Sequence, residues 1–207
     1  MGCDIHPYLE FSNPDAETFC LSGEISLGRC YTLFNIMAGV RGFDHPLFIP
    51  RGIPHTPKIS RKVESNYYLY IADPTPSQDG CGSYRRDRTI DPKEASKLVN
   101  ENKALYYDNK RYITDPTWHT ASWLSKNELI QVRKKYLLET LNFDATEYTG
   151  RKRADAIKKI EEADAYELMK YTFPTIENVA LNATIGSMIA IENSGDYTAR
   201  LVFWFDS

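Results

Sequence analysis

Both ends of the chain have the residue pattern of a β-strand. Near the N-terminus, Ile5, Leu9 and Phe11 alternate with polar neighbours, which is the period of two typical of a strand with one polar face. The ending TARLVFWFDS (198–207) is also strongly patterned as a strand. We therefore expect a strand at each end of the chain, and we expect the two strands to lie near each other in one sheet.

Between these ends, apolar residues recur at helical spacing. Residues 31–40 form one such segment, which Gly39 and Gly42 end. From residue 125 onward the chain is mainly helical, with Ser125 and Glu128 as a capping box before the first apolar stripe. The pattern predicts helices at 31–40, at 91–102, from 125 onward, at 151–171, and from Pro174 to a turn at 193–196.

Other segments predict short strands and long loops. YYLYI (67–71) has the character of a buried strand, and residues 104–114 predict two short strands around an Asp-Asn turn. Residues 41–62 contain four prolines, two glycines and seven basic side chains counting the histidines, so we expect a long Pro-rich basic loop. The polar segment 73–90 predicts an excursion with a mobile tip.

These elements predict a single α+β domain spanning 1–207, with a small mixed or antiparallel sheet that contains both terminal strands and is packed by about four to five helices. The composition is that of a globular protein, with 42% hydrophobic and 26% charged residues among 207. A net charge of -3 argues against nucleic acid as the main partner. The chain shows no apolar run long enough to cross a bilayer and no signal-peptide pattern, so we expect no membrane partner.

The N-terminal strand carries the first candidate site. Strand alternation projects Asp4 and His6 from the same face, with Cys3 on the opposite one. An Asp-x-His pair can present a carboxylate and an imidazole to one metal ion, or its carboxylate can orient the imidazole as a base. The alternative is a buried polar cluster that ties the N-terminus into the sheet. The role of Cys3 stays open.

A second candidate site precedes the helix that starts near residue 125. Its polar side chains and flanking tryptophans are Asp115, Trp118, His119, Thr120, Ser122 and Trp123. We expect a loop-to-helix junction here. Such junctions favour anions because free backbone N–H groups and the positive end of the helix dipole lie at the helix N-terminus. The alternative is that Thr120 and Ser122 cap the helix while His119 packs between the tryptophans.

The Pro-rich basic loop is the third candidate. Arg41, His45 and Arg51 lie in it, and arginine offers a planar fork of donors that matches phosphate oxygens. In the segment PRGIP, prolines on both sides stiffen the backbone at Arg51, as preorganised anion recognition requires. The alternative is an ordinary surface loop with solvated charges.

Several short motifs together resemble a group of conserved proteins from tailed bacteriophages and prophages. They are MGCDIH, YTLFNIMAGVRG followed by PRGIP, HTASWL, and the ending RLVFWFDS. Similar motifs occur in the same order in that group. The resemblance runs from end to end and is specific at these motifs, whereas residues 73–103 and His55 have no counterpart. It implies a phage source, and hence the cytoplasm of an infected bacterial host, but it supplies no mechanism.

We expect the protein to act on a phosphate-containing small molecule, by hydrolysing a linear or cyclic nucleotide that signals host defence. We favour a phosphodiesterase-like hydrolase. In it, Asp4 orients His6, or the two residues share one divalent metal ion with His119. The expected catalytic residues are Asp4, His6, His119 and Ser122, and the expected ligand-binding residues are Arg41, His45, Arg51, Trp118 and Trp123.

Two other functions stay open at this point. The protein could sequester the nucleotide without chemistry, or it could inhibit a host enzyme by protein–protein contact, and a homo-oligomer is compatible with each. The enzyme and the sequestering protein both require 3–6, 41–51 and 118–123 to converge. We expect that convergence, with Asp206 as a second partner near the same sheet edge, whereas the inhibitor predicts that Asp4, His6 and His119 lie apart.

Overall fold

The computed structural model describes residues 2–42, 45–54, 58–71, 104–107, 110–114, 118–143, 151–171 and 175–206. The described chain has an α+β fold, as the sequence predicts. Its central sheet is antiparallel, with the strand order β2-β1-β7-β6. The strands are β1 (Ile5–Ser12), β2 (Cys20–Glu24), β6 (His119–Ser125) and β7 (Thr198–Phe205).

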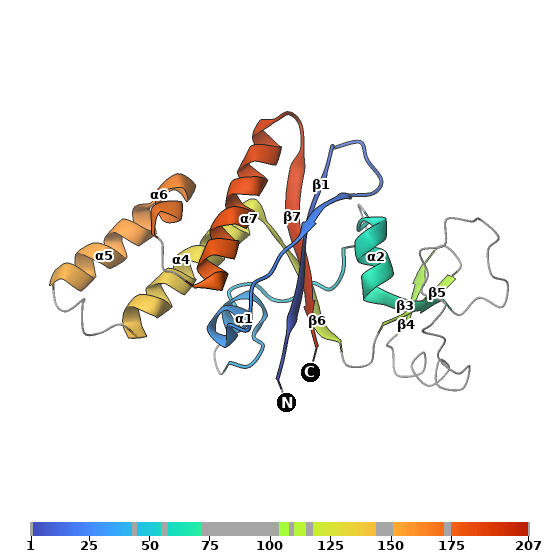
Figure 1. Cartoon of the computed structure of the whole chain (residues 1–207), viewed down its shortest axis with the longest axis horizontal. Coiled ribbons are helices and arrows are strands. Elements are labelled where there is room, and N and C mark those ends of the chain that lie inside the picture. Colours follow the sequence, from blue (N-terminus) through green and yellow to red (C-terminus); the bar gives the residue numbers. More distant parts are fainter. Residues whose placement is uncertain are drawn as a thin grey trace.

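Helices pack on both faces of this sheet, and a second, three-stranded sheet has the order β3-β5-β4. The described helices are α1 (Tyr31–Ala38), α2 (Arg61–Tyr67), α4 (Lys126–Phe143), α5 (Arg151–Glu162), α6 (Ala165–Lys170) and α7 (Ile176–Asn193). The strands of the second sheet are β3 (Tyr68–Ile71), β4 (Ala104–Tyr107) and β5 (Lys110–Thr114). In Figure 1, α1, α4 and α7 lie on one side of the central strands and α2 lies on the other.

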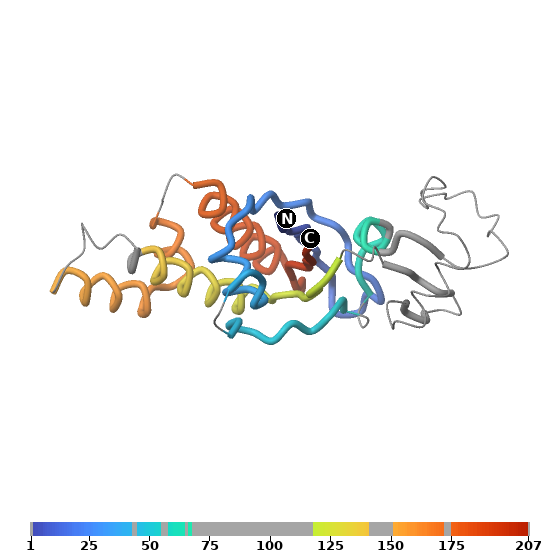
Figure 2. Tube along the Cα trace, turned by 90° about the horizontal axis from the view of Figure 1, so that it is seen from below, coloured from blue at the N-terminus to red at the C-terminus, as the bar shows by residue number. Residues whose placement is uncertain are grey.

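The two terminal strands are direct neighbours, so the prediction that both belong to one sheet is confirmed. They pair antiparallel from Ile5 opposite Phe205 to Ser12 opposite Thr198. The two chain ends consequently lie side by side, as Figure 2 shows. β7 is an inner strand, and every residue after its first is buried.

Alternate residues of β7 belong to two different cores. One face, with Leu201, Phe203 and Phe205, packs against α1, α4 and α7. The other face, with Val202 and Trp204, packs against α2 and against the segment that precedes it. A hydrophobic strand with both faces covered explains why the ending LVFWF is apolar throughout, since an inner strand has no solvent face.

Buried polar contacts attach the Pro-rich segment to the second face. Arg200 on β7 donates to the Glu10 carboxylate at 3.0–3.1 Å and to the Lys58 carbonyl at 3.1 Å. The same carboxylate accepts the Ser60 N–H at 2.6 Å. The two charges are almost fully buried and satisfy each other and the loop backbone, which is the condition under which buried charges are tolerated.

The helical prediction for 151–171 is correct in type and wrong in continuity. The segment forms two helices, because the Asp164 carboxylate accepts the Glu167 N–H at 2.8 Å and starts α6 with a capping box. The buried guanidinium of Arg133 on α4 donates to the Tyr171 carbonyl at 2.7 Å, just past the end of α6. Burial lowers the pKa of Arg133 to about 10.

The expectation of a loop at 118–125 is wrong, and the expectations for 73–102 cannot be compared with the structure. The segment 118–125, expected as a loop before a helix, contains the strand β6, and the capping box follows directly: Ser125 Oγ accepts the Glu128 N–H at 3.4 Å. The predicted helix 91–102 and excursion 73–90 lie outside the described residues. Within the part of the chain that the structure describes, no helix has both the length and the apolar character to cross a membrane.

Candidate functional site

The central feature of the candidate site is a histidine–carboxylate pair at the end of the sheet. His6, on β1, lies with its Nε2 3.1 Å from Asp206 Oδ2, directly after β7. The other oxygen of Asp206 accepts the Asp4 N–H at 2.9 Å, and the Asp206 N–H donates back to the Asp4 carbonyl at 3.1 Å. The carboxylate is thereby fixed in front of the imidazole. About a third of each side chain is exposed, 31% for His6 and 34% for Asp206.

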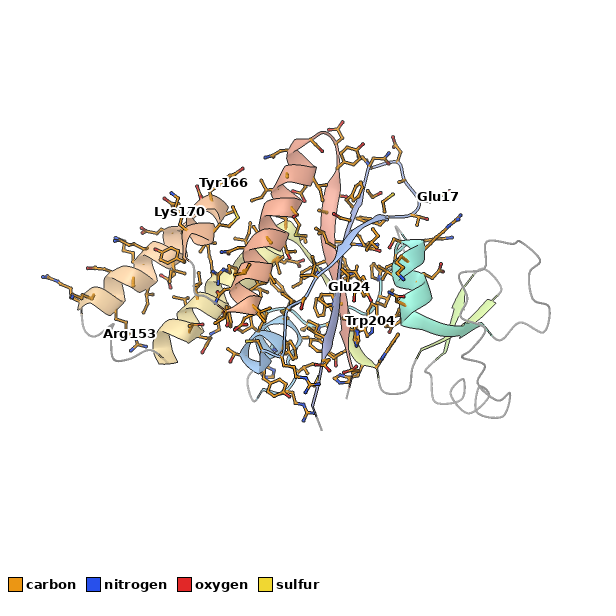
Figure 3. All side chains as sticks on the ribbon, viewed as in Figure 1. Glu17, Glu24, Arg153, Tyr166, Lys170 and Trp204 are labelled. Atoms are coloured by element: carbon orange, nitrogen blue, oxygen red, sulfur yellow. The ribbon has the colours of Figure 1, made fainter. Side chains whose placement is uncertain are left out.

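Two neighbouring tryptophan rings contact the imidazole. The His6 ring stacks on Trp204, with centroids 5.6 Å apart and 16° between planes, and it lies 5.8 Å from the ring of Trp118. Trp204, labelled in Figure 3, is fully buried among these rings and Tyr67. Its indole Nε1 has no hydrogen-bond partner in the described chain. A buried donor without an acceptor is uncommon in folded proteins.

An exposed ion pair flanks the histidine. The Arg29 guanidinium donates from Nη2 to Asp4 Oδ2 at 2.6 Å and from Nε to Oδ1. This pairing lowers the pKa of Asp4. A groove of about 590 Å³, lined by residues 4, 5, 7 and 24–29, opens beside the pair. We call Asp4, His6, Arg29, Trp118 and Asp206 the strand-end cluster.

Cys3 and Arg41 lie at the same end of the sheet. Cys3 is fully buried, and burial raises the pKa of its thiol although a hydrogen bond with Arg41 opposes the shift. A buried, protonated thiol is a poor nucleophile. Arg41 has a backbone φ of 60°, in the left-handed region that arginine rarely adopts. The structure thus brings Arg41 to this end of the sheet.

His119 lies two strands from β1, at the same end of the sheet. Its Cα is opposite Phe205, which is itself opposite Ile5. Its ring stacks on Phe205 with centroids 6.0 Å apart, whereas His6 stacks on the next residue of β7. Since neighbouring residues of a strand point to opposite faces, the two imidazoles lie on opposite faces of the sheet.

A separate group joins the Pro-rich loop to β6 and the start of α4. We call it the edge clamp, and its members are Arg51, Ser122, Trp123 and Glu128. The Arg51 guanidinium donates to both carboxylate oxygens of Glu128, at 2.9 and 3.1 Å, and to the Trp123 carbonyl. It also lies 3.7 Å from the centre of the Trp123 ring. Burial opposes ionisation of Glu128, but the hydrogen bonds from Arg51 and Ser125 outweigh it, so its pKa is lowered.

The backbone of PRGIP completes the edge clamp. The Arg51 N–H donates to Ser122 Oγ at 3.2 Å, and the Gly52 N–H donates to the Ala121 carbonyl at 2.9 Å. These bonds cover the free edge of β6, which would otherwise expose unpaired backbone groups. Ser122 is only 2% exposed. The edge clamp therefore uses the side chains expected for anion binding and catalysis to join a loop to a strand.

The structure brings some predicted site residues together and separates others. Asp4, His6 and Trp118 belong to the strand-end cluster, with Arg41 and His119 at the same end of the sheet. Arg51, Ser122 and Trp123 form the edge clamp, and His45 is exposed in the loop after α1. Among the residues that the structure describes, no three His, Cys, Asp or Glu side chains group closely enough to hold a metal ion, so Asp4, His6 and His119 do not form a metal site there.

Three residues that contact these groups were not identified from sequence as site residues: Arg29, Glu128 and Trp204. Each contacts a residue far away in the chain, so its role depends on the tertiary fold. The capping box marked Glu128 only as a helix-start residue. Asp206, in contrast, follows from the expectation that the terminal strands pair, since pairing carries it to the start of β1.

No protein-family model matches this chain, and neither characterised proteins nor solved structures show a significant match to it. The functional argument therefore depends on the geometry described above.

Proposed function

We propose that the protein hydrolyses a phosphate ester of a nucleotide at the strand-end cluster, with His6 as the general base. The His6–Asp206 pair is the observation that carries this proposal. An ionised carboxylate accepts hydrogen bonds only, so the pair keeps the imidazole proton on Nε2 and leaves the lone pair on Nδ1. A histidine held in one tautomer beside solvent is suited to take a proton from water.

The surroundings of the pair support a nucleotide as the ligand. Trp118 offers a partly exposed indole on which a base can stack. The Arg29–Asp4 pair is exposed, with side-chain exposures of 57% and 46%, so water and salt screen it and it opens at low cost. Arg29 would then be free to exchange the carboxylate for a phosphate, which its fork of donors also matches.

The test is turnover of a panel of linear and cyclic nucleotides by the full chain, with products separated by chromatography. We expect at least one nucleotide to be hydrolysed, and we expect His6→Gln and Asp206→Asn to lower the rate by about 100-fold or more, the usual effect of losing a general base. Asp196→Asn, in the exposed turn before β7, is the matched control and should leave the rate unchanged. Equal rates in all three variants would remove His6 from the reaction.

Sequestration of the same nucleotide is the second candidate function. It is favoured by the position of Ser122, the hydroxyl expected to act in catalysis, which is buried and accepts a backbone N–H. Binding without chemistry requires only the aromatic and cationic groups of the strand-end cluster. Recovery of the bound nucleotide chemically intact after heat denaturation would favour sequestration over hydrolysis.

The biological setting of the proposal comes from the phage-like motifs. A phage protein that removes a signalling nucleotide would counter a host defence that depends on that signal. His6 and Asp4 lie together, whereas His119 is on the opposite face of the sheet, so the support for a ligand site over a host-enzyme inhibitor comes from the His6–Asp206 pair alone. A phage lacking the gene should then replicate poorly only on hosts that carry a nucleotide-signalled defence.

A further inference from the structure

On the opposite face of the sheet from His6, two strands away, lies a hydroxyl–imidazole pair that the proposed function does not use. Thr120 Oγ1 is 2.9 Å from His119 Nδ1. Both side chains are partly exposed. A hydroxyl within hydrogen-bond reach of an imidazole is the arrangement that activates serine and threonine nucleophiles. Stacking on Phe205 fixes the plane of the His119 ring, so the base is oriented by packing.

The backbone of Thr120 is strained. Its φ is 52°, and this threonine and Arg41 are the two non-glycine residues with positive φ in the described chain. A β-branched residue is strongly disfavoured in this region because its side chain crowds the backbone. The strain coincides with a β-bulge, since the pairing of β6 with β7 shifts register between His119 and Ser122. Bulges and strained residues of this kind redirect side chains at reactive sites.

Other threonines show what an ordinary hydroxyl does in this fold. Thr140, Thr184 and Thr198 each donate to a backbone carbonyl, at 2.8, 2.7 and 3.4 Å. Those contacts satisfy the hydroxyl locally and have no chemical consequence. Thr120 pairs with a base instead, on an edge strand and at a strained residue.

We infer that Thr120 is a nucleophile towards phosphorus and that His119 is its base, forming a second reactive centre that goes beyond the His6–Asp206 pair. Thr120 Oγ1 forms a bond to the phosphorus of a phosphate ester while the bond from phosphorus to the leaving oxygen breaks. His119 Nδ1 takes the hydroxyl proton and returns it to the leaving oxygen. The cationic side chain of Arg41, at the same end of the sheet, favours a phosphoryl group over a neutral acyl group.

Labelling with diisopropyl fluorophosphate tests the nucleophile directly. In this reaction Oγ1 bonds to phosphorus, the P–F bond breaks and fluoride leaves, while His119 takes the proton. Intact-mass and peptide mass spectrometry of the full chain should locate one adduct on Thr120. Thr120→Val should remove it, Thr120→Ser should retain it, and His119→Gln should slow labelling by about 100-fold. Thr198→Val is the matched strand-threonine control and should label like the wild type.

Each outcome supports or overturns the inference without reference to nucleotides. An adduct on Thr120 that depends on His119 supports the nucleophile even if no nucleotide in the panel is hydrolysed. Absence of an adduct on Thr120, or labelling at the same rate in His119→Gln, overturns it and leaves the His6–Asp206 proposal unaffected. Circular dichroism melts of the variants, which keep similar side-chain volumes, verify that each is folded at the labelling temperature.

Discussion

The strand-end cluster and the edge clamp contain the same kinds of side chain and use them differently. Each has an arginine paired with a carboxylate next to a tryptophan. In the edge clamp, Arg51 satisfies Glu128 and a carbonyl while covering an indole, and Ser122 is buried. In the strand-end cluster the ion pair is exposed, and the indole N–H of the neighbouring Trp204 has no partner among the described residues. Saturated, covered polar groups indicate a structural role, whereas the exposed pair is accessible to a ligand.

The largest stability difference should separate the two arginines. Arg51→Ala removes three charged hydrogen bonds and a cation–π contact and leaves Glu128 partly buried without its arginine partner, so we expect a loss of about 2 kcal/mol in unfolding free energy. Arg29→Ala, the matched variant in the strand-end cluster, should leave the unfolding midpoint unchanged because its ion pair is exposed. Urea denaturation of both variants measures the difference, and equal destabilisation would contradict the distinction between the two groups.

A smaller effect of opposite sign is expected at the strained residue. Thr120→Gly relieves a left-handed backbone conformation that costs about 1–2 kcal/mol, against a glycine entropy cost of about 0.5–1 kcal/mol. We therefore expect the variant to be more stable by up to about 1 kcal/mol while it loses the reactive hydroxyl. The measurement is the thermal unfolding midpoint of Thr120→Gly, compared with that of Thr120→Ser, which keeps the strain. A destabilised glycine variant would show that the conformation is not strained.

The smallest effect is a pH dependence in the edge clamp. The pKa of Glu128 is lower in the folded protein, so its pairing with Arg51 stabilises fully above the ordinary glutamate pKa of about 4.3 and is lost as the pH falls through the folded value. The stability difference between wild type and Glu128→Gln should be constant from pH 5 to 7, on the order of 1 kcal/mol, and should shrink below about pH 4. A difference that persists at pH 3 would contradict this assignment.

Local patterns were sufficient to predict much of the fold. Alternation in the first segment identified β1, the apolar β-forming residues of the last segment identified β7, and the capping box of Ser125 and Glu128 identified the start of α4. The break between α5 and α6 was missed although Asp164 and Glu167 also have capping-box spacing. The signal was present in the sequence, but the continuous apolar spacing of 151–171 concealed it.

The candidate site was less predictable, because its partners depend on long-range register. His6 was identified from its own strand, and its contact with Asp206 followed from pairing of the chain ends. The order of the strands and the path of the Pro-rich loop determine that Arg51 binds Glu128 and that Trp204 is buried beside His6. The strand character of HTASWL was also missed, since its polar residues resemble a loop until β7 covers it.

The pairing of β1 with β7 also determines when the site can exist during folding. His6 and Asp206 are separated by 200 residues along the chain, whereas contacts within a helix join residues four apart. Closing so long a loop is slow, so helices such as α4 and α7 can form before the central sheet is complete. We therefore expect the His6–Asp206 pair to assemble late, after helical structure has formed. Formation of this pair during refolding should lag behind recovery of the helical signal.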